Sequence, residues 1–140
     1  MSDIYQRIYQ RKRMAAAEAM SLIEDGDFIC VPTGVGEPPT LLTALSEQRR
    51  NFHGVTVGQI LPLRKYAYID PETVEHVRHL AFFCGGATRP GGHEGWIDYL
   101  PSYFSEMPSL IRNRQLRVDA VFSMASPMDE HGFFALSLAT

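Results

Sequence analysis

The sequence predicts a single α/β domain built around a mainly parallel β-sheet. Its 140 residues fit one domain, and the 45% of hydrophobic residues suffice for a buried core. Short apolar segments with strand character alternate with segments of helical periodicity. Such alternation is typical of βα units, in which helices cover both faces of a parallel sheet.

The amino-terminal half is expected to form a helix, a strand, a glycine turn, a second helix and a second strand. Asp25-Gly26-Asp27 is turn chemistry that ends the first helix, and the glycines at 34 and 36 separate the first strand from the next helix. The predicted ranges are helix 4–24, strand 28–32, helix 40–48 and strand 54–58.

The carboxyl-terminal half is expected to complete the sheet. The predicted ranges are a turn or short helix at 70–72, a strand over 77–84, a glycine-rich loop over 85–95, a strand-like segment over 97–100, a helix over 102–112 interrupted at Pro108, a strand over 119–124, a polar turn over 126–132 and a last strand over 133–138. Because the sequence stops directly after this apolar segment, we expect a truncated chain or an excised domain over residues 1–140.

Composition argues against several classes of partner. The 13 basic and 16 acidic residues give a net charge of -3, and this balance gives no electrostatic reason to expect binding to nucleic acid or to a membrane. Cys30 and Cys84 lie among apolar residues and are expected to be buried free thiols in a reducing compartment. The sequence shows neither a signal-peptide pattern nor an apolar run of membrane-spanning length, so a cytoplasmic location is expected.

The segment Gly34-Val35-Gly36-Glu37-Pro38-Pro39 is the best candidate for a binding loop. A glycine pair between a strand and a helix lets the backbone approach a ligand and direct N–H groups at a phosphate or at a thioester oxyanion. A tight βα turn without any ligand explains the same residues, and the two interpretations stay open at this point. A dinucleotide motif is disfavoured, because Pro39 stands where the third glycine would be.

The other polar clusters indicate no nucleophile and no metal site. The segment from Ser126 to Gly132 is typical of a structured turn, and an acid/base pair of Asp129 and His131 is disfavoured because near neighbours in sequence seldom face each other. His76 and His79 have a spacing that would suit metal ligands on a helix, but they lie in a segment that resembles a strand entering the core.

The chain resembles the acetyl-CoA hydrolase/transferase family, which includes 4-hydroxybutyrate and butyrate–acetate CoA-transferases. The resemblance rests on the order and combined length of several motifs rather than on any one of them. They are Glu24-Asp25-Gly26-Asp27, Gly34 to Pro39 with Leu41, Leu42, Ala44 and Leu45, then Phe82-Phe83, Arg89, Gly95, Asp98-Tyr99-Leu100-Pro101, Ser105-Glu106-Met107-Pro108, Asp119-Ala120-Val121 and Ser126 to Phe133.

The resemblance implies an open three-layer α/β/α fold of the CoA-transferase type, two such domains in each subunit and a homo-oligomer, usually a dimer. It also implies transfer of CoA between an acyl-CoA and a small carboxylate, or hydrolysis, through a glutamyl-CoA intermediate. The nucleophilic glutamate belongs to the second domain, so this chain alone is expected to be inactive. CoA is a substrate, and no bound cofactor or metal is expected.

The resemblance also assigns site residues. The family's glycine loop lines the CoA and acyl site, which implies this role for Gly34, Val35, Gly36, Glu37 and Pro38. Residues expected to border the site are Arg89, Ser126, Asp129, His131 and Gly132. Two other hypotheses remain: a non-catalytic subunit of a split CoA-transferase, and a CoA- or nucleotide-binding module without catalysis.

Overall fold

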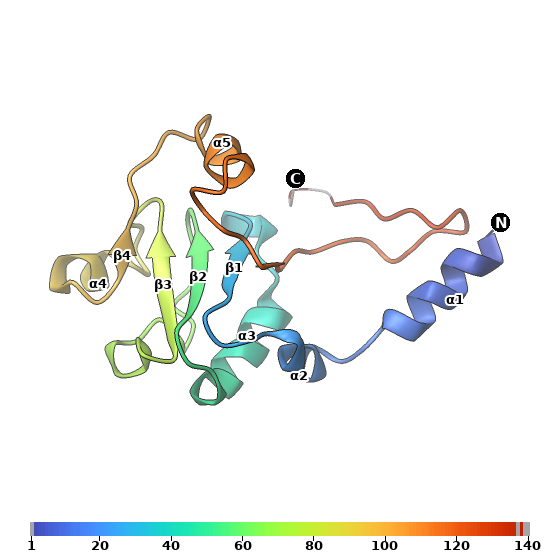
Figure 1. Ribbon diagram of the computed structural model, residues 1–140, viewed down its shortest axis with the longest axis horizontal. Coiled ribbons are helices and arrows are strands. Elements are labelled where there is room, and N and C mark those ends of the chain that lie inside the picture. Colours follow the sequence, from blue (N-terminus) through green and yellow to red (C-terminus); the bar gives the residue numbers. More distant parts are fainter. Residues whose placement is uncertain (1, 137, 139–140) are drawn as a thin grey trace.

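A five-stranded parallel sheet forms the centre of the computed structural model, which describes residues 2–136 and 138 (Figure 1). The strands lie in the order β4-β3-β2-β1-β5. The predicted α/β class and mainly parallel sheet are confirmed. The strands are β1 (Phe28–Val31), β2 (Val55–Gln59), β3 (Val77–Ala81), β4 (Asp98–Tyr99) and β5 (Ala120–Val121).

The described residues also form five α-helices and four 3₁₀ turns, of which α1, α2 and the first turn precede β1. The helices are α1 (Ser2–Lys12), α2 (Ala16–Ala19), α3 (Pro39–Gln48), α4 (Arg89–Glu94) and α5 (Met107–Arg112). The 3₁₀ turns span Met20–Leu22, Gly34–Gly36, Arg49–Asn51 and Pro71–Thr73. In the part of the chain described here, no helix is both long and apolar enough to cross a membrane.

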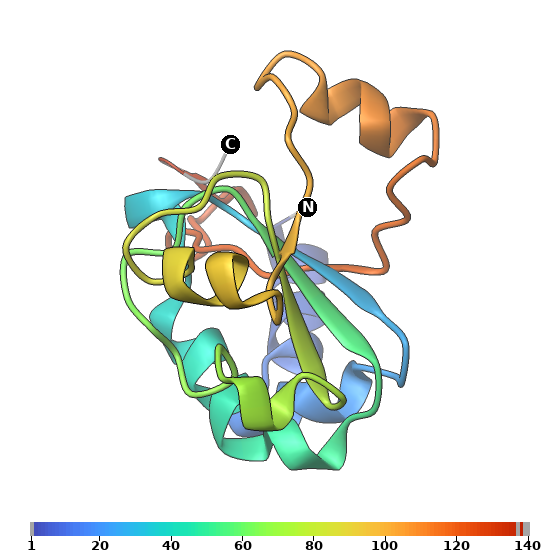
Figure 2. The same cartoon turned by 90° about the vertical axis from the view of Figure 1, so that its left-hand side faces the viewer.

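The core lies between the sheet and α3. Alternate residues of each strand face this side, so Ile29, Val55 and Val77 are fully buried. From α3, Leu42 and Leu45 pack onto them, and α2 packs against α3 from outside. Figure 2 shows α3 on one side of the sheet and α5 beyond the carboxyl ends of the strands.

The opposite face of the sheet is less covered. Phe28, Cys30 and Leu80 are only partly buried there, and the ring of Phe28 lies against Gly58 so closely that a Cβ would not fit. Arg78 and Asp98, on neighbouring strands, form an ion pair of 3.3 Å on this face. Such an exposed pair contributes little to stability.

The prediction of one helix over residues 4–24 is wrong. The chain leaves α1 after Lys12, and Ala15 is extended with ψ at 151° before α2 begins. Tertiary packing overrides the local helical pattern, because α2 packs on α3 whereas α1 packs on a distant segment. The Tyr9 ring lies 5.8 Å from that of Phe134, centroid to centroid.

The predictions for residues 85–95 and 102–112 also need correction. The glycine-rich loop over 85–95 contains α4, and the helix expected over 102–112 begins only at Met107. Pro108 therefore lies in the first turn, where proline is tolerated, and does not interrupt the helix.

The strand expected over 133–138 is not formed by its described residues, 133–136 and 138. Instead the chain folds back on itself after β5, and the N–H of Ser126 donates to the Ala135 carbonyl at 2.8 Å. Ser137 lies outside the described residues. Several of its backbone N–H groups find partners within this turn, which projects away from the sheet together with α1 (Figure 1).

His79 is a buried polar residue in the middle of the sheet. Its side chain is 2% exposed, and neither ring nitrogen has a hydrogen-bond partner in the described part of the chain. Burial lowers the pKa of the His79 imidazole from 6.5 to about 4. The neutral ring is therefore the form that the fold accommodates.

We expect His79 to make the fold sensitive to acid. Because the pKa of His79 is lower in the folded than in the unfolded protein, its titration leaves the free energy of unfolding unchanged above pH 6.5 and lowers it as the pH falls from 6.5 towards 4. Each pH unit within this window costs about 1.4 kcal/mol. Urea unfolding at several pH values should show that the free energy of unfolding falls less steeply with decreasing pH in His79→Leu than in the wild type. Parallel pH profiles for the two proteins would contradict this assignment.

Candidate functional site at the carboxyl edge of the sheet

The order of the strands marks one position at the carboxyl edge. From β1 the chain adds β2, β3 and β4 successively on one side and then returns to place β5 on the other side of β1. In open parallel sheets, ligands bind in the crevice that opens where the strand order reverses in this way. The loops that follow β1 and β5 flank that crevice here.

A cavity of about 260 Å³ lies at this point. It is lined by Val35, Met124, Ala125, Ser126, Ala135, Leu136 and Leu138. Two residues predicted for the site, Val35 of the glycine loop and Ser126, are thus brought together although they are far apart in sequence. The cavity wall is mainly apolar, which suits an acyl chain or the thioester end of a larger ligand.

The glycine loop is a 3₁₀ turn whose amides are largely engaged. The N–H of Gly34 donates to the Leu61 carbonyl at 2.8 Å, and that of Gly36 donates to Thr33 at 3.1 Å. The N–H of Glu37 donates to Gly34 at 3.1 Å. Val35 is the exposed member of the loop, at 63%, so contact with a ligand in this conformation falls mainly to Val35.

Glu37 turns away from the cavity into the interior. Its side chain is 3% exposed, and its carboxylate accepts hydrogen bonds from the Tyr66 hydroxyl at 2.9 Å and from the Gln59 amide at 3.1 Å. The Leu63 N–H adds a bond of 3.2 Å, and the Arg64 guanidinium lies 3.6 Å away. A carboxylate surrounded by donors in this way is held in place rather than presented to a substrate.

Gln59 and Tyr66 are residues that the sequence analysis did not single out. Burial raises the pKa of the Tyr66 phenol to about 12, and its hydrogen bond to the Glu37 carboxylate adds to this effect. Tyr66 therefore stays protonated and remains a donor. A sequence signal that could have found Gln59 is its position in β2, where it follows the inward-facing Val55 and Val57 at the alternation of a strand; no comparable signal marks Tyr66.

The remaining predicted site residues lie elsewhere. Arg89 is exposed and begins α4, which follows β3 and is therefore separated from β1 by β2. Gly132 lies against the Tyr5 side chain of α1. Asp129 and His131 occupy the same turn, so Ser126 is the only one of these bordering residues that lines the cavity.

Asp129 organises the turn from Ser126 to Ala135. Its Oδ1 accepts hydrogen bonds from the N–H groups of Phe133 at 2.8 Å and His131 at 2.9 Å. These two bonds, the Phe133 bond first, lower the pKa of the Asp129 carboxyl below its ordinary value. The Asp129 carboxylate thus bonds backbone groups of its own turn, as expected for a residue that stabilises the turn.

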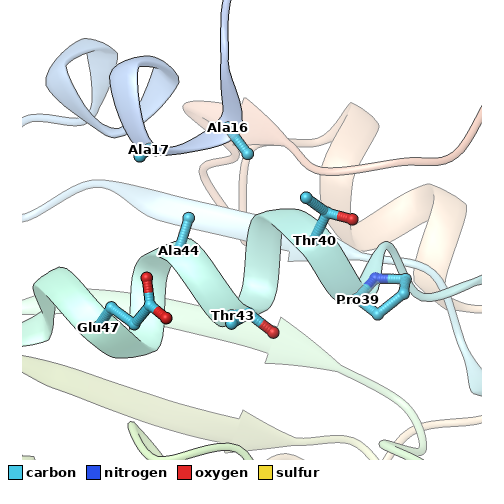
Figure 3. A pocket seen from close by; sticks show the side chains of 7 residues that line it. All are labelled: Ala16, Ala17, Pro39, Thr40, Thr43, Ala44 and Glu47. Carbon is cyan, nitrogen blue, oxygen red and sulfur yellow. The ribbon is translucent and has the colours of Figure 1, made fainter.

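Neither a metal-ligand cluster nor the hollow beside α3 offers an alternative site in the described part of the chain. Among the described residues, no three histidine, cysteine, aspartate or glutamate side chains are grouped as metal ligands. A larger hollow of about 410 Å³ lies between α2 and α3, where Ala16 and Ala17 lie opposite Ala44 (Figure 3). Its only charged lining residue, Glu47, would repel the phosphates of a nucleotide, so this hollow is not the candidate site.

Comparison with known proteins identifies the class of this α/β domain. Residues 2–140 match the family described as "Acetyl-CoA hydrolase/transferase N-terminal domain". The succinyl-CoA:cyclohexane-1-carboxylate CoA transferase of Geobacter metallireducens is 35% identical over 135 residues, which cover 96% of this chain and 30% of that protein. The 4-hydroxybutyrate coenzyme A transferase of Clostridium kluyveri is 32% identical and covers 96% of this chain and 32% of that protein.

A solved structure agrees with the sequence comparisons. The crystal structure of RipA from Yersinia pestis superposes with a TM-score of 0.82 at 26% identity, over 94% of this chain and 33% of that one. The chain belongs to the acetyl-CoA hydrolase/transferase family and corresponds to its amino-terminal domain. It spans about a third of the length of these relatives.

The backbone of Gly34 gives a direct test of the loop. Its φ is +56°, and a Cβ there would meet no atom within 4 Å, so only backbone conformation opposes a side chain. We expect Gly34→Ala to lower the free energy of unfolding by about 1–2 kcal/mol. Gly34→Asn should cost less, because asparagine tolerates left-handed backbone. Equal losses for the two variants in urea unfolding would argue against this conformation.

Proposed function

We propose that this domain forms the amino-terminal part of an acyl-CoA:carboxylate CoA-transferase and binds the acyl-CoA thioester at the crevice between β1 and β5. The observation that carries the proposal is the meeting of the glycine loop with the segment after β5 where the strand order reverses. In this proposal Gly34, Val35, Gly36 and Pro38 shape one wall and Ser126 part of the other. Arg89, Asp129, His131 and Gly132 are at most peripheral.

The proposed reaction needs a carboxylate nucleophile from outside the described residues of this chain. A glutamate oxygen attacks the thioester carbonyl carbon, the C–S bond breaks, and CoA leaves as a thiolate, giving an acyl-glutamyl anhydride. The thiolate then attacks the glutamyl carbonyl, releases the first carboxylate and forms glutamyl-CoA. The acceptor carboxylate reverses these steps and leaves as the new acyl-CoA.

Glu37 is the carboxylate nearest to the glycine loop in sequence, and its surroundings argue against this nucleophilic role. Its oxygens accept bonds from Tyr66, Gln59 and the Leu63 N–H. A nucleophile needs a free lone pair aimed at the thioester carbon, whereas this side chain is 3% exposed. This supports the proposal that a second domain or subunit supplies the glutamate.

An activity assay tests the proposal. The 140-residue chain alone should show no exchange of CoA between acetyl-CoA and propionate above buffer. Fusing it to the remaining two thirds of the Geobacter metallireducens relative, whose own amino-terminal part is removed, should restore transfer. A matched fusion with the relative's own amino-terminal part is the positive control.

The two unfavourable outcomes point to different errors. Turnover by the chain alone would show that the nucleophile lies within it. A fusion that folds, judged by circular dichroism and cooperative unfolding, yet transfers no CoA would contradict the assigned function.

A further inference from the structure

The buried side chains around Glu37 connect the glycine loop to the segment that follows β2. The Gln59 amide nitrogen donates to the Pro32 carbonyl at 3.0 Å and to the Glu37 carboxylate at 3.1 Å. Pro32 precedes the glycine loop and Glu37 follows it, so one amide group ties together both ends of the loop.

Two further hydrogen bonds hold the same carboxylate. The Tyr66 hydroxyl donates to Oε1 at 2.9 Å, and the Leu63 N–H donates to Oε2 at 3.2 Å. The Gly34 N–H adds a backbone bond to the Leu61 carbonyl at 2.8 Å. The stretch 59–66 thus contacts the loop at Gly34 and holds the residues on either side of it, Pro32 through its carbonyl and Glu37 through its carboxylate.

The loop depends on such anchors because of its own composition. Glycine loses more conformational freedom on folding than any other residue, and Gly34 and Gly36 flank an exposed Val35. Contacts from outside the loop must therefore hold it in one of the backbone conformations that its glycines allow. Buried hydrogen bonds to a carboxylate are among the stronger contacts available for this.

We infer that Glu37, Gln59 and Tyr66 are positioning residues, here called the loop clamp, that fix the glycine loop at the cavity between β1 and β5. None of the three lines that cavity, so they act on a ligand only through the loop. The clamp itself is independent of the proposed function. Its consequence for turnover rests on that function, because it assumes that the loop contacts an acyl-CoA.

A pair of neighbouring tyrosines provides a matched test. Tyr66 and Tyr68 are both buried and stack with ring centroids 6.1 Å apart. The Tyr66 hydroxyl bonds Glu37, whereas the Tyr68 hydroxyl has no hydrogen-bond partner among the described residues. Tyr66→Phe and Tyr68→Phe therefore remove the same atom from the same stack, and only the first variant loosens the clamp.

Hydrogen–deuterium exchange of the purified chain is the measurement. In Tyr66→Phe, the amides of Gly34, Gly36 and Glu37 should exchange about tenfold faster, as expected for the loss of one hydrogen bond to a charged group, while those of β2 and β3 remain unchanged. In Tyr68→Phe the loop amides should exchange at the wild-type rate. Glu37→Gln, which puts an NH₂ group among donors, should accelerate loop exchange at least as much as Tyr66→Phe.

Three results would overturn the clamp: unchanged loop exchange in Tyr66→Phe, equal acceleration in both tyrosine variants, or acceleration spread over every strand. A kinetic measurement on the active fusion separates the clamp from the function. A lower kcat/KM in Tyr66→Phe, with Tyr68→Phe at the wild-type value, supports both. Local loop acceleration with unchanged kcat/KM in Tyr66→Phe supports the clamp and counts against contact between the glycine loop and the acyl-CoA, because the active fusion has already shown CoA transfer.

Discussion

The position of β1 between β2 and β5 is the constraint on which the site depends. From β1 the chain passes to β2 on one side, whereas β5, the neighbour on the other side, is reached only after β4, so the strand order reverses at β1 and a crevice opens between the segments that follow β1 and β5. The strand register shows where the two sides meet: Cys30 of β1 pairs with Gly58 of β2 on one side and with Val121 of β5 on the other. The loops that begin just beyond these pairs contribute Val35 and Met124 to the cavity.

The two walls of the crevice differ in how they are supported. The glycine loop is anchored by the buried polar side chains of Glu37 and Gln59. It also adjoins the hydrophobic core that α3 forms with the sheet. The wall after β5 is held mainly by its own turn, which Asp129 and Ser126 stabilise through backbone contacts. The exposed side chains of Phe133, at 70%, and Leu138, at 67%, lie on the second wall or beside it.

The sequence was most informative where local chemistry decides the structure. The first strand, predicted over 28–32, is Phe28–Val31, and the helix predicted over 40–48 is Pro39–Gln48, because an apolar run, two glycines and a proline mark these boundaries locally. α4 was missed because it contains Pro90, Gly91 and Gly92, and Ile97 packs where a Cβ of Gly91 would lie. The inward turn of Glu37 could not be predicted either, since its partners Gln59 and Tyr66 lie 22 and 29 residues away.

The central claim is that the crevice between β1 and β5 binds an acyl-CoA, and amide chemical-shift mapping tests it most directly. Acetyl-CoA titrated into the ¹⁵N-labelled chain should shift the amides of Val35, Gly36 and residues 124–126 in a saturable manner. Amides on the distant open face, such as those of Arg78 and Asp98, should not move. Saturable shifts confined to the groove between α2 and α3, around Thr43 and Glu47, would contradict the account.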